Sequence, residues 1–252
     1  MIDRETLTRI SKIMGLKLFQ QEKNYVQTVL LRSIYSKVSR ELTFKGGTAL
    51  ALFYGLNRFS EDLDFTLEED FDLQDLMKEI KRDFEALDME ASFKVLEDSP
   101  RSFSLRIGAE GPLFTREIER CYVRVDVSKT EKVLRAVQVK ELRPMYPDIL
   151  PFFVVVMDPD EILAEKAKAT VSRAKARDLY DLWFLLNMNA KIDLELIGEK
   201  LQYYEKDFRV REFMENVRKL RRVWERELRP VVVGSLPKFE EVEKGLSCRF
   251  LS

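Results

Sequence analysis

Apolar residues recur at helical spacing over the first 41 residues, with charged residues between them. Neither Gly nor Pro interrupts this segment between Leu16 and Lys45. The pattern predicts that the chain begins with helices. The recurring apolar positions are Leu18, Val26, Leu30, Ile34 and Val38.

The pattern then changes to short runs of β-forming residues separated by turn signals. The predicted strands are residues 42–44, 63–67, 90–96, 102–107, 122–128, 136–139 and 152–157. Two helices are predicted among them, at 48–54 with Thr48 as a possible N-cap, and at 73–87. We therefore expect a mixed sheet in this half of the chain.

Helical periodicity returns after Asp158, where Pro159 suits a first helical turn. The predicted helices are residues 160–175, 178–186, 194–204 and 209–227. The pattern predicts an α+β protein with an α/β domain at 1–157, N-terminal helices included, and a helical domain at 158–252. The basic run in the last helix could contact RNA, but an apolar stripe favours an ordinary amphipathic helix. The stripe consists of Phe213, Val217, Leu220 and Trp224.

Composition narrows the possible chemistry. The chain of 252 residues carries a formal net charge of −1, so nucleic-acid binding would need a local basic patch. It contains no histidine, which excludes Ser-His and Cys-His nucleophile pairs and His metal ligands. Any bound metal must therefore be held mainly by carboxylates, which favours Mg²⁺, Mn²⁺ or Ca²⁺.

Cysteine use and hydropathy indicate the compartment. The two cysteines, Cys121 and Cys248, form neither a metal motif nor a disulfide framework, which is typical of a reducing interior. The longest apolar run, residues 152–157, is far too short to cross a bilayer, and no signal peptide is visible. We expect a cytoplasmic protein that does not bind to or span a membrane.

The strongest chemical signal is Gly46-Gly47 followed by Asp62-x-Asp64. A glycine turn before a helix leaves backbone N–H groups free to receive a triphosphate. Two aspartates at i and i+2 on a strand point to the same face and can bind one hard cation. Each signal is weak alone, as a turn or a solvated strand edge, but their order within about twenty residues favours a functional site.

A third carboxylate, Asp126, lies in the strand-like run 123–127. It shares a face with Arg124 and Ser128. On a neighbouring strand, Asp126 would complete a two-metal site that stabilises both the attacking and the leaving oxygen. An exposed edge position is the alternative.

The helical half holds a second set of charged candidates. Asp178 and Asp181 share a helix face, whereas Glu161 and Lys166 lie about 140° apart on theirs. Lys166 can therefore point to a cleft while Glu161 packs or caps elsewhere. The alternatives are a solvated lysine for Lys166 and an N-terminal helix acid for Asp178.

Lys45, Arg58 and Ser60 flank the glycine–aspartate unit. Arg58 precedes Asp62 by four residues, so its guanidinium can bind phosphate or pair with Asp62 or Asp64. We count all three flanking residues as nucleotide-binding candidates.

The stretch 45–65, KGGTALALFYGLNRFSEDLDF, resembles the first motif of the AbiEii/AbiGii-type nucleotidyltransferase toxins, a branch of the DNA polymerase β-like superfamily. Its Gly-Gly and Asp-x-Asp match the superfamily pattern, with a slightly longer spacer between them. Later family motifs resemble Glu161-x-x-x-x-Lys166 and Asp178-x-x-Asp181. A Lys-Glu motif of some relatives has no secure match.

The resemblance implies Mg²⁺- or Mn²⁺-dependent transfer of a nucleotidyl group from an NTP to an RNA (tRNA-like) or protein acceptor. It also implies a toxin with a cognate antitoxin, in a type IV-like or phage-defence pair, and a helical domain that completes the active-site cleft. On this hypothesis Asp62, Asp64 and Asp126 bind metal, with Asp126 as an alternative base. The phosphates contact Gly46, Gly47, Thr48 and Lys166, and Asp178 and Asp181 position the nucleotide or orient Lys166.

Two other functions remain open from the sequence. One is a catalytically inactive NTP-binding module on the same fold. The other is a carboxylate-metal phosphodiesterase, because three acids without histidine can also cleave phosphodiesters. The glycine turn favours a nucleotidyltransferase over a phosphodiesterase, because hydrolysis of a phosphodiester does not require a binding site for a triphosphate.

Overall fold

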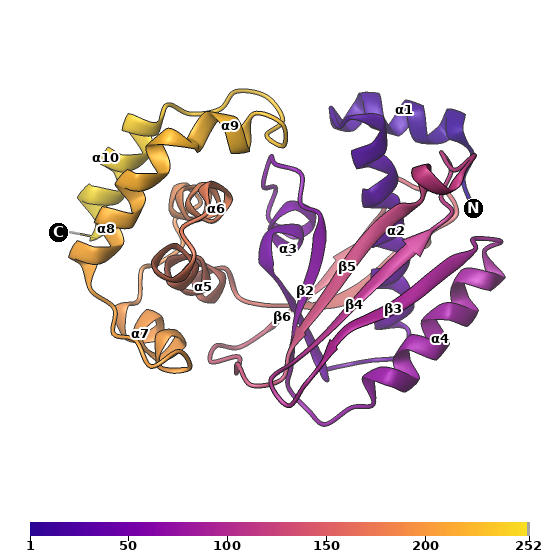
Figure 1. The fold of residues 1–252 in the computed structure, drawn as a ribbon, viewed down its shortest axis with the longest axis horizontal. Coiled ribbons are helices and arrows are strands. Elements are labelled where there is room, and N and C mark those ends of the chain that lie inside the picture. The colour runs from indigo at the N-terminus through magenta and orange to yellow at the C-terminus, as the bar shows by residue number, and fades with distance from the viewer. Residues whose placement is uncertain (251–252) are drawn as a thin grey trace. The chain divides into compact units, whose positions relative to one another are not determined.

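The computed structural model describes residues 1–250, which form two compact units (Figure 1). The first unit comprises residues 1–54, 59–132 and 137–156. The second contains the chain from Met157 onward together with two short earlier segments, residues 55–58 and 133–136. The sequence pattern did not indicate these two segments.

The first unit is a seven-stranded mixed sheet with helices. Its elements are α1 (Arg4–Met14), α2 (Leu18–Tyr35), β1 (Leu42–Lys45), α3 (Gly46–Phe53), β2 (Asp62–Leu67), α4 (Leu73–Ala86), β3 (Ala91–Asp98), β4 (Ser102–Ala109), the 3-10 turn η1 (Glu117–Glu119), β5 (Cys121–Ser128), β6 (Gln138–Leu142) and β7 (Phe152–Val156). The predicted mixed sheet is confirmed.

The strand order is β3-β4-β5-β2-β1-β7-β6. Strands β2 and β5 are parallel neighbours, as are β1 and β7, and the other pairs are antiparallel. Strand β2 therefore lies between β1 and β5 in the middle of the sheet. This position brings the Asp-x-Asp segment next to residues from both neighbours.

One face of the sheet is apolar and covered, and the other is polar. Phe44, Leu63, Phe65 and Val125 are buried in a core that also contains apolar residues of α2 and α4. Figure 1 shows α2 running behind β4 and β5. On β2 and β5, the residues that alternate with the core positions carry charged or hydroxyl side chains, because successive side chains of a strand point to opposite faces.

The second unit is helical. Its elements are α5 (Pro159–Ser172), α6 (Ala176–Asn187), α7 (Leu194–Gln202), α8 (Val210–Lys219), the 3-10 turn η2 (Leu220–Arg222), α9 (Trp224–Leu228) and α10 (Phe239–Phe250). Asp158 caps α5 by accepting a hydrogen bond from the Asp160 amide, and Pro159 occupies the first turn, as predicted.

Two helix predictions in the second unit need correction. The single helix expected at 209–227 is broken into α8 and α9 by η2, without any Gly or Pro at the break. Helix α10 was not predicted. All four residues of the predicted apolar stripe are nevertheless buried, which supports an ordinary amphipathic role for this region. No helix among residues 1–250 is both long and apolar enough to cross a membrane.

Candidate active site

The β1–α3 turn is built on Gly46. This residue has φ +77°, a left-handed conformation that residues with a Cβ rarely adopt. A Cβ at Gly46 would also collide with the Asp64 carboxylate. The glycine turn and the Asp-x-Asp strand therefore touch. The first amides of α3 lack partners within the helix, so this end of α3 is suited to an anion.

Thr48 has a different local role from the one expected. Helix α3 begins at Gly46 and Lys45 takes the N-cap position, so Thr48 is the third residue of the helix. The predicted N-cap at Thr48 is wrong, because α3 already begins at Gly46. The Thr48 hydroxyl donates to the Asp62 carbonyl at 2.6 Å, and the side chain is buried. Thr48 thus fastens the helix start to β2.

The acidic residues form a row across two parallel strands. Asp62 and Asp64 are partly exposed and alternate with buried Leu63 and Phe65. Asp64 lies in register with Asp126 of β5. The structure therefore brings the third carboxylate onto the strand next to the Asp-x-Asp pair, on the same face.

The donor set of Asp62, Asp64 and Asp126 suits a hard divalent cation, because all its ligand atoms are carboxylate oxygens. In residues 1–250, however, no three acidic, His or Cys side chains are grouped closely enough to hold a metal. Asp126 accepts from Arg124 Nε at 2.9 Å, and the same Nε contacts Ser104 Oγ at 3.0 Å. Arg124 contacts only Oδ1 of Asp126, so metal binding by all three aspartates would require their carboxylates to move closer together, with Oδ2 of Asp126 as a possible ligand atom.

Lys45 and Ser60 were predicted nucleotide ligands, and each has a protein partner. Lys45 pairs through Nζ with Glu131 Oε2 at 2.6 Å, and both side chains are buried. The Ser60 carbonyl accepts from Gln27 at 3.1 Å. Sequence reasoning missed Glu131, which carries no local motif. Lys45 also lies in register with Asp64, next to the acidic row.

In the second unit, four of the predicted residues form one buried ionic network. Arg58 binds Asp181 with two hydrogen bonds of 2.6 Å, through Nε and Nη2. Lys166 Nζ lies 2.7 Å from Asp181 and 3.2 Å from Asp178. Arg173, which the sequence did not single out, bonds Asp178 at 2.8 Å.

This network changes two expectations. Arg58 pairs with Asp181 and is only 4% exposed, whereas the sequence suggested Asp62, Asp64 or phosphate as its partner. Lys166 is buried and paired, so it is not a solvated lysine. Its contacts with Asp178 and Asp181 agree with the hypothesis that these acids orient it.

Electrostatics keep the network charged. Burial alone lowers the pKa of Lys166, but the attraction of Asp181 and Asp178 outweighs burial and raises the pKa above 10.5. Burial likewise opposes ionisation of Asp178, yet the charge of Lys166 and the Arg173 hydrogen bond hold the pKa of Asp178 below 3.8. Lys166 is therefore an ammonium ion at neutral pH, which suits charge neutralisation and not proton abstraction.

Glu161 has a structural role in the second unit. It is fully buried and accepts from the amides of Leu134 and Arg135, both at 2.8 Å. Lys200, also fully buried, completes the arrangement at 2.5 Å from Glu161 and 3.4 Å from Glu165. The sequence predicted that Glu161 packs or caps away from Lys166, but it did not indicate Lys200 as the partner of Glu161 and Glu165.

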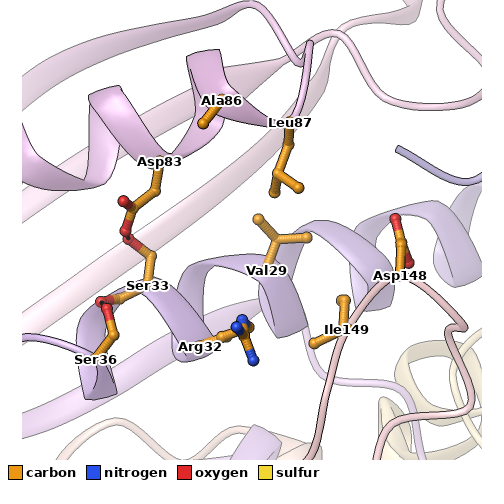
Figure 2. Close-up of a pocket in the computed structure, with 9 residues that line it drawn as sticks. All are labelled: Val29, Arg32, Ser33, Ser36, Asp83, Ala86, Leu87, Asp148 and Ile149. Carbon is orange, nitrogen blue, oxygen red and sulfur yellow. Dashed lines mark hydrogen bonds between the residues drawn. The ribbon is translucent and has the colours of Figure 1, made fainter.

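A cavity of about 240 Å³ lies elsewhere in the first unit, between α2 and α4 (Figure 2). Val29, Leu87 and Ile149 supply its apolar wall, and Ser33 bonds Asp83 at 2.5 Å at its rim. None of the predicted site residues lines this cavity.

The chain matches the family model for the nucleotidyl transferase AbiEii toxin of type IV toxin–antitoxin systems over residues 29–244. Comparison with curated proteins gave no match. Among solved structures, the fold is similar to that of MenT4, a nucleotidyltransferase toxin from Mycobacterium tuberculosis, with a TM-score of 0.68 and 20% identity over 99% of this chain and 89% of that one. JHP933 from Helicobacter pylori is similar with a TM-score of 0.61 and 20% identity, over 89% of this chain and 90% of that one.

These structural similarities show the fold, and the family match shows the family. The glycine turn, the Asp-x-Asp strand, Lys166 and Asp178-x-x-Asp181 all lie within the matched residues. The chain belongs to the AbiEii nucleotidyltransferase toxin family.

Proposed function

We propose that this protein transfers a nucleotidyl group from an NTP to an RNA or protein acceptor, in a reaction that depends on Mg²⁺ or Mn²⁺. As in its family, such a toxin would be paired with a cognate antitoxin. The observation that carries the proposal is the contact of the Gly46 turn with Asp64, which itself lies in register with Asp126. An anion-binding helix end and a carboxylate row thus meet at one place.

Each residue of the first unit has a separate task in this proposal. The amides at the start of α3, at Gly46 and Gly47, bind the phosphates of the NTP. Asp62 and Asp64 hold the metal, which when bound neutralises phosphate charge and orients the triphosphate. Asp126 joins the metal ligands or accepts the proton of the acceptor hydroxyl at a carboxylate oxygen.

For the second unit we propose that Lys166 neutralises charge that grows on the leaving pyrophosphate. Asp178 and Asp181 set its position, as their contacts of 3.2 Å and 2.7 Å support. Arg58 is a positioning residue, because its guanidinium is buried against Asp181. Lys45 holds Glu131 beside the acidic row and serves the nucleotide indirectly.

The test is to incubate the protein with each α-³²P-labelled NTP, Mg²⁺ and total RNA. Label that moves to RNA or to protein supports transfer, and Asp62→Asn should remove it without changing the melting temperature. Protection by NTP against melting without transfer indicates a binding module. Fragmentation of RNA without label transfer indicates a phosphodiesterase. An Asp62→Asn protein that still transfers label contradicts the assignment.

A further inference from the structure

A second row of charges crosses the polar face of the sheet beside the acidic row. Asp62 of β2 lies in register with Arg124 of β5, Arg124 with Arg106 of β4, and Arg106 with Lys94 of β3. All three basic side chains are exposed. We call Lys94, Arg106 and Arg124 the basic strip. It starts next to Asp62 and ends at the edge strand of the sheet.

Two members of the strip have no acidic partner. In the part of the chain that the structure describes, no ion pair or side-chain hydrogen bond joins Lys94 or Arg106 to another residue. Neighbouring cations are paired, as Lys129 is with Asp98 at 2.7 Å and Arg120 with Glu110 at 2.6 Å. The charges of Lys94 and Arg106 are thus available to an anion from outside the protein.

An aromatic ring lies beside the strip. Tyr122 of β5 is 44% exposed, and the guanidinium carbon of Arg106 lies 5.3 Å from its ring centroid. Gly108, its in-register neighbour on β4, leaves room for the ring: a Cβ there would lie 2.7 Å from Tyr122 Cε1. The Tyr122 ring therefore lies against Arg106 and close to the backbone of Gly108, while part of it faces solvent.

Exposed cations in a row beside an exposed aromatic ring are the features that bind single-stranded nucleic acid. The cations attract phosphates, and a ring stacks on any base. Three strand spacings separate Asp62 from Lys94, a span of about 14 Å, which corresponds to roughly four stacked nucleotides. No bulk positive charge assists such binding, since the formal net charge of the chain is −1.

We propose that the basic strip and Tyr122 bind a single-stranded nucleic acid and direct its terminal hydroxyl toward Asp62 and Asp64. The inference rests on the proposed nucleotidyl transfer and names a nucleic-acid strand as the acceptor. The alternative for Lys94 is protection of the edge strand β3 against pairing with other chains. That alternative does not explain Arg106 or Arg124, because β4 and β5 lie inside the sheet.

The test measures binding of a short fluorescein-labelled single-stranded RNA, and of DNA with the same sequence, by anisotropy without added NTP. The variant is Lys94→Glu/Arg106→Glu. The matched control is Arg9→Glu/Lys12→Glu, which changes the net charge equally at two exposed positions of α1. We expect at least tenfold weaker binding for the strip variant only. For the strip variant, the slope of log K for binding against log salt concentration should become less negative by about 1.4, because two phosphate contacts are lost.

Tyr122 gives an independent readout. Tyr122→Ala should weaken binding at least about fivefold, whereas Tyr122→Phe should bind as the wild type does, because stacking needs the ring and not the hydroxyl. Tighter binding of RNA than of DNA would indicate that the strip contacts a 2′-hydroxyl group. Equal binding would indicate that it contacts only phosphates and bases. Both results support the proposal.

Equal binding by the strip variant and the α1 control overturns the proposal, as does label transfer to protein alone. These failures differ from failure of the proposed function. If only the strip proposal fails, the wild-type protein still transfers label from NTP, and NTP still protects it against melting. If the proposed function fails, the protein neither transfers label nor is protected by NTP, whether or not it binds the oligonucleotide.

Discussion

The two sets of candidate residues differ sharply in burial. Asp62, Asp64 and Asp126 on the sheet are partly exposed. In the second unit, Asp178 and Asp181 are fully buried, and Lys166 is 8% exposed. Charges near solvent can be removed with little cost to folding, whereas buried charges depend on one another. Substitutions in the first set should therefore report on chemistry, and those in the second on stability as well.

The largest effect on folding is expected for Asp181→Ala. It leaves Arg58 and Lys166 buried with fewer opposite charges, which should lower the free energy of unfolding by about 3–5 kcal/mol. Urea unfolding measures this. The control is Glu225→Ala, which removes an exposed pair with Arg229 in the same unit and should cost at most about 1 kcal/mol. Similar losses for the two variants would show that burial does not set the cost of removing a charge in this unit.

Asp62→Asn should show the opposite behaviour. We expect at least about a thousand-fold loss of nucleotidyl transfer, equivalent to about 4 kcal/mol in the transition state, because a metal ligand loses its charge. The free energy of unfolding should change by no more than about 0.5 kcal/mol. Label transfer and urea unfolding on the same preparation separate the two quantities. A large loss of stability would show that Asp62 has a structural role.

Gly46→Ala should affect both quantities. The left-handed backbone conformation and the collision with Asp64 should together cost about 1–3 kcal/mol of stability and reduce transfer strongly. Gly198→Ala is the control, because Gly198 lies within α7 and nothing is near its added Cβ. That change should be neutral or stabilise by up to about 1 kcal/mol. Wild-type transfer by Gly46→Ala would exclude the turn from nucleotide binding.

The smallest effect concerns pH. The raised pKa of Lys166 means that its stabilising contribution is complete below pH 10.5 and is lost as the pH rises through the folded-state value. The stability difference between the wild type and Lys166→Met should therefore be constant from about pH 6 to pH 9 and shrink above about pH 10.5. Unfolding curves across this range measure the difference. A change between pH 6 and pH 8 would mean that Lys166 loses its charge near neutrality.

Local pattern was enough to predict several particular features. Alternation of Asp62, Leu63, Asp64 and Phe65 gave both the strand and its acidic face, because a strand has a period of two. Asp158 and Pro159 predicted the start of α5, because an N-cap carboxylate followed by proline favours a first helical turn. The break at 220–222 was missed because no Gly or Pro marks it, whereas helix α10 was missed although Gly234 and Pro237 precede it.

The partners of the charged residues could not be predicted in this way. Arg58 and Asp181 are 123 positions apart, and Lys45 and Glu131 are 86 apart. Their pairing depends on which elements the fold brings together. From the sequence we expected Arg58 to pair with Asp62 or Asp64, which are closer along the chain, but in the structure it pairs with Asp181.

Periodicity and spacing are local properties, so the sequence alone was enough for most of the elements, for the glycine–aspartate motif and for the family. Only the tertiary structure decided that Asp64 touches Gly46 and lies in register with Asp126, because register is set by strand pairing. The tertiary structure also aligned Arg124, Arg106 and Lys94 across three strands. Residues far apart in sequence become neighbours only when the sheet forms.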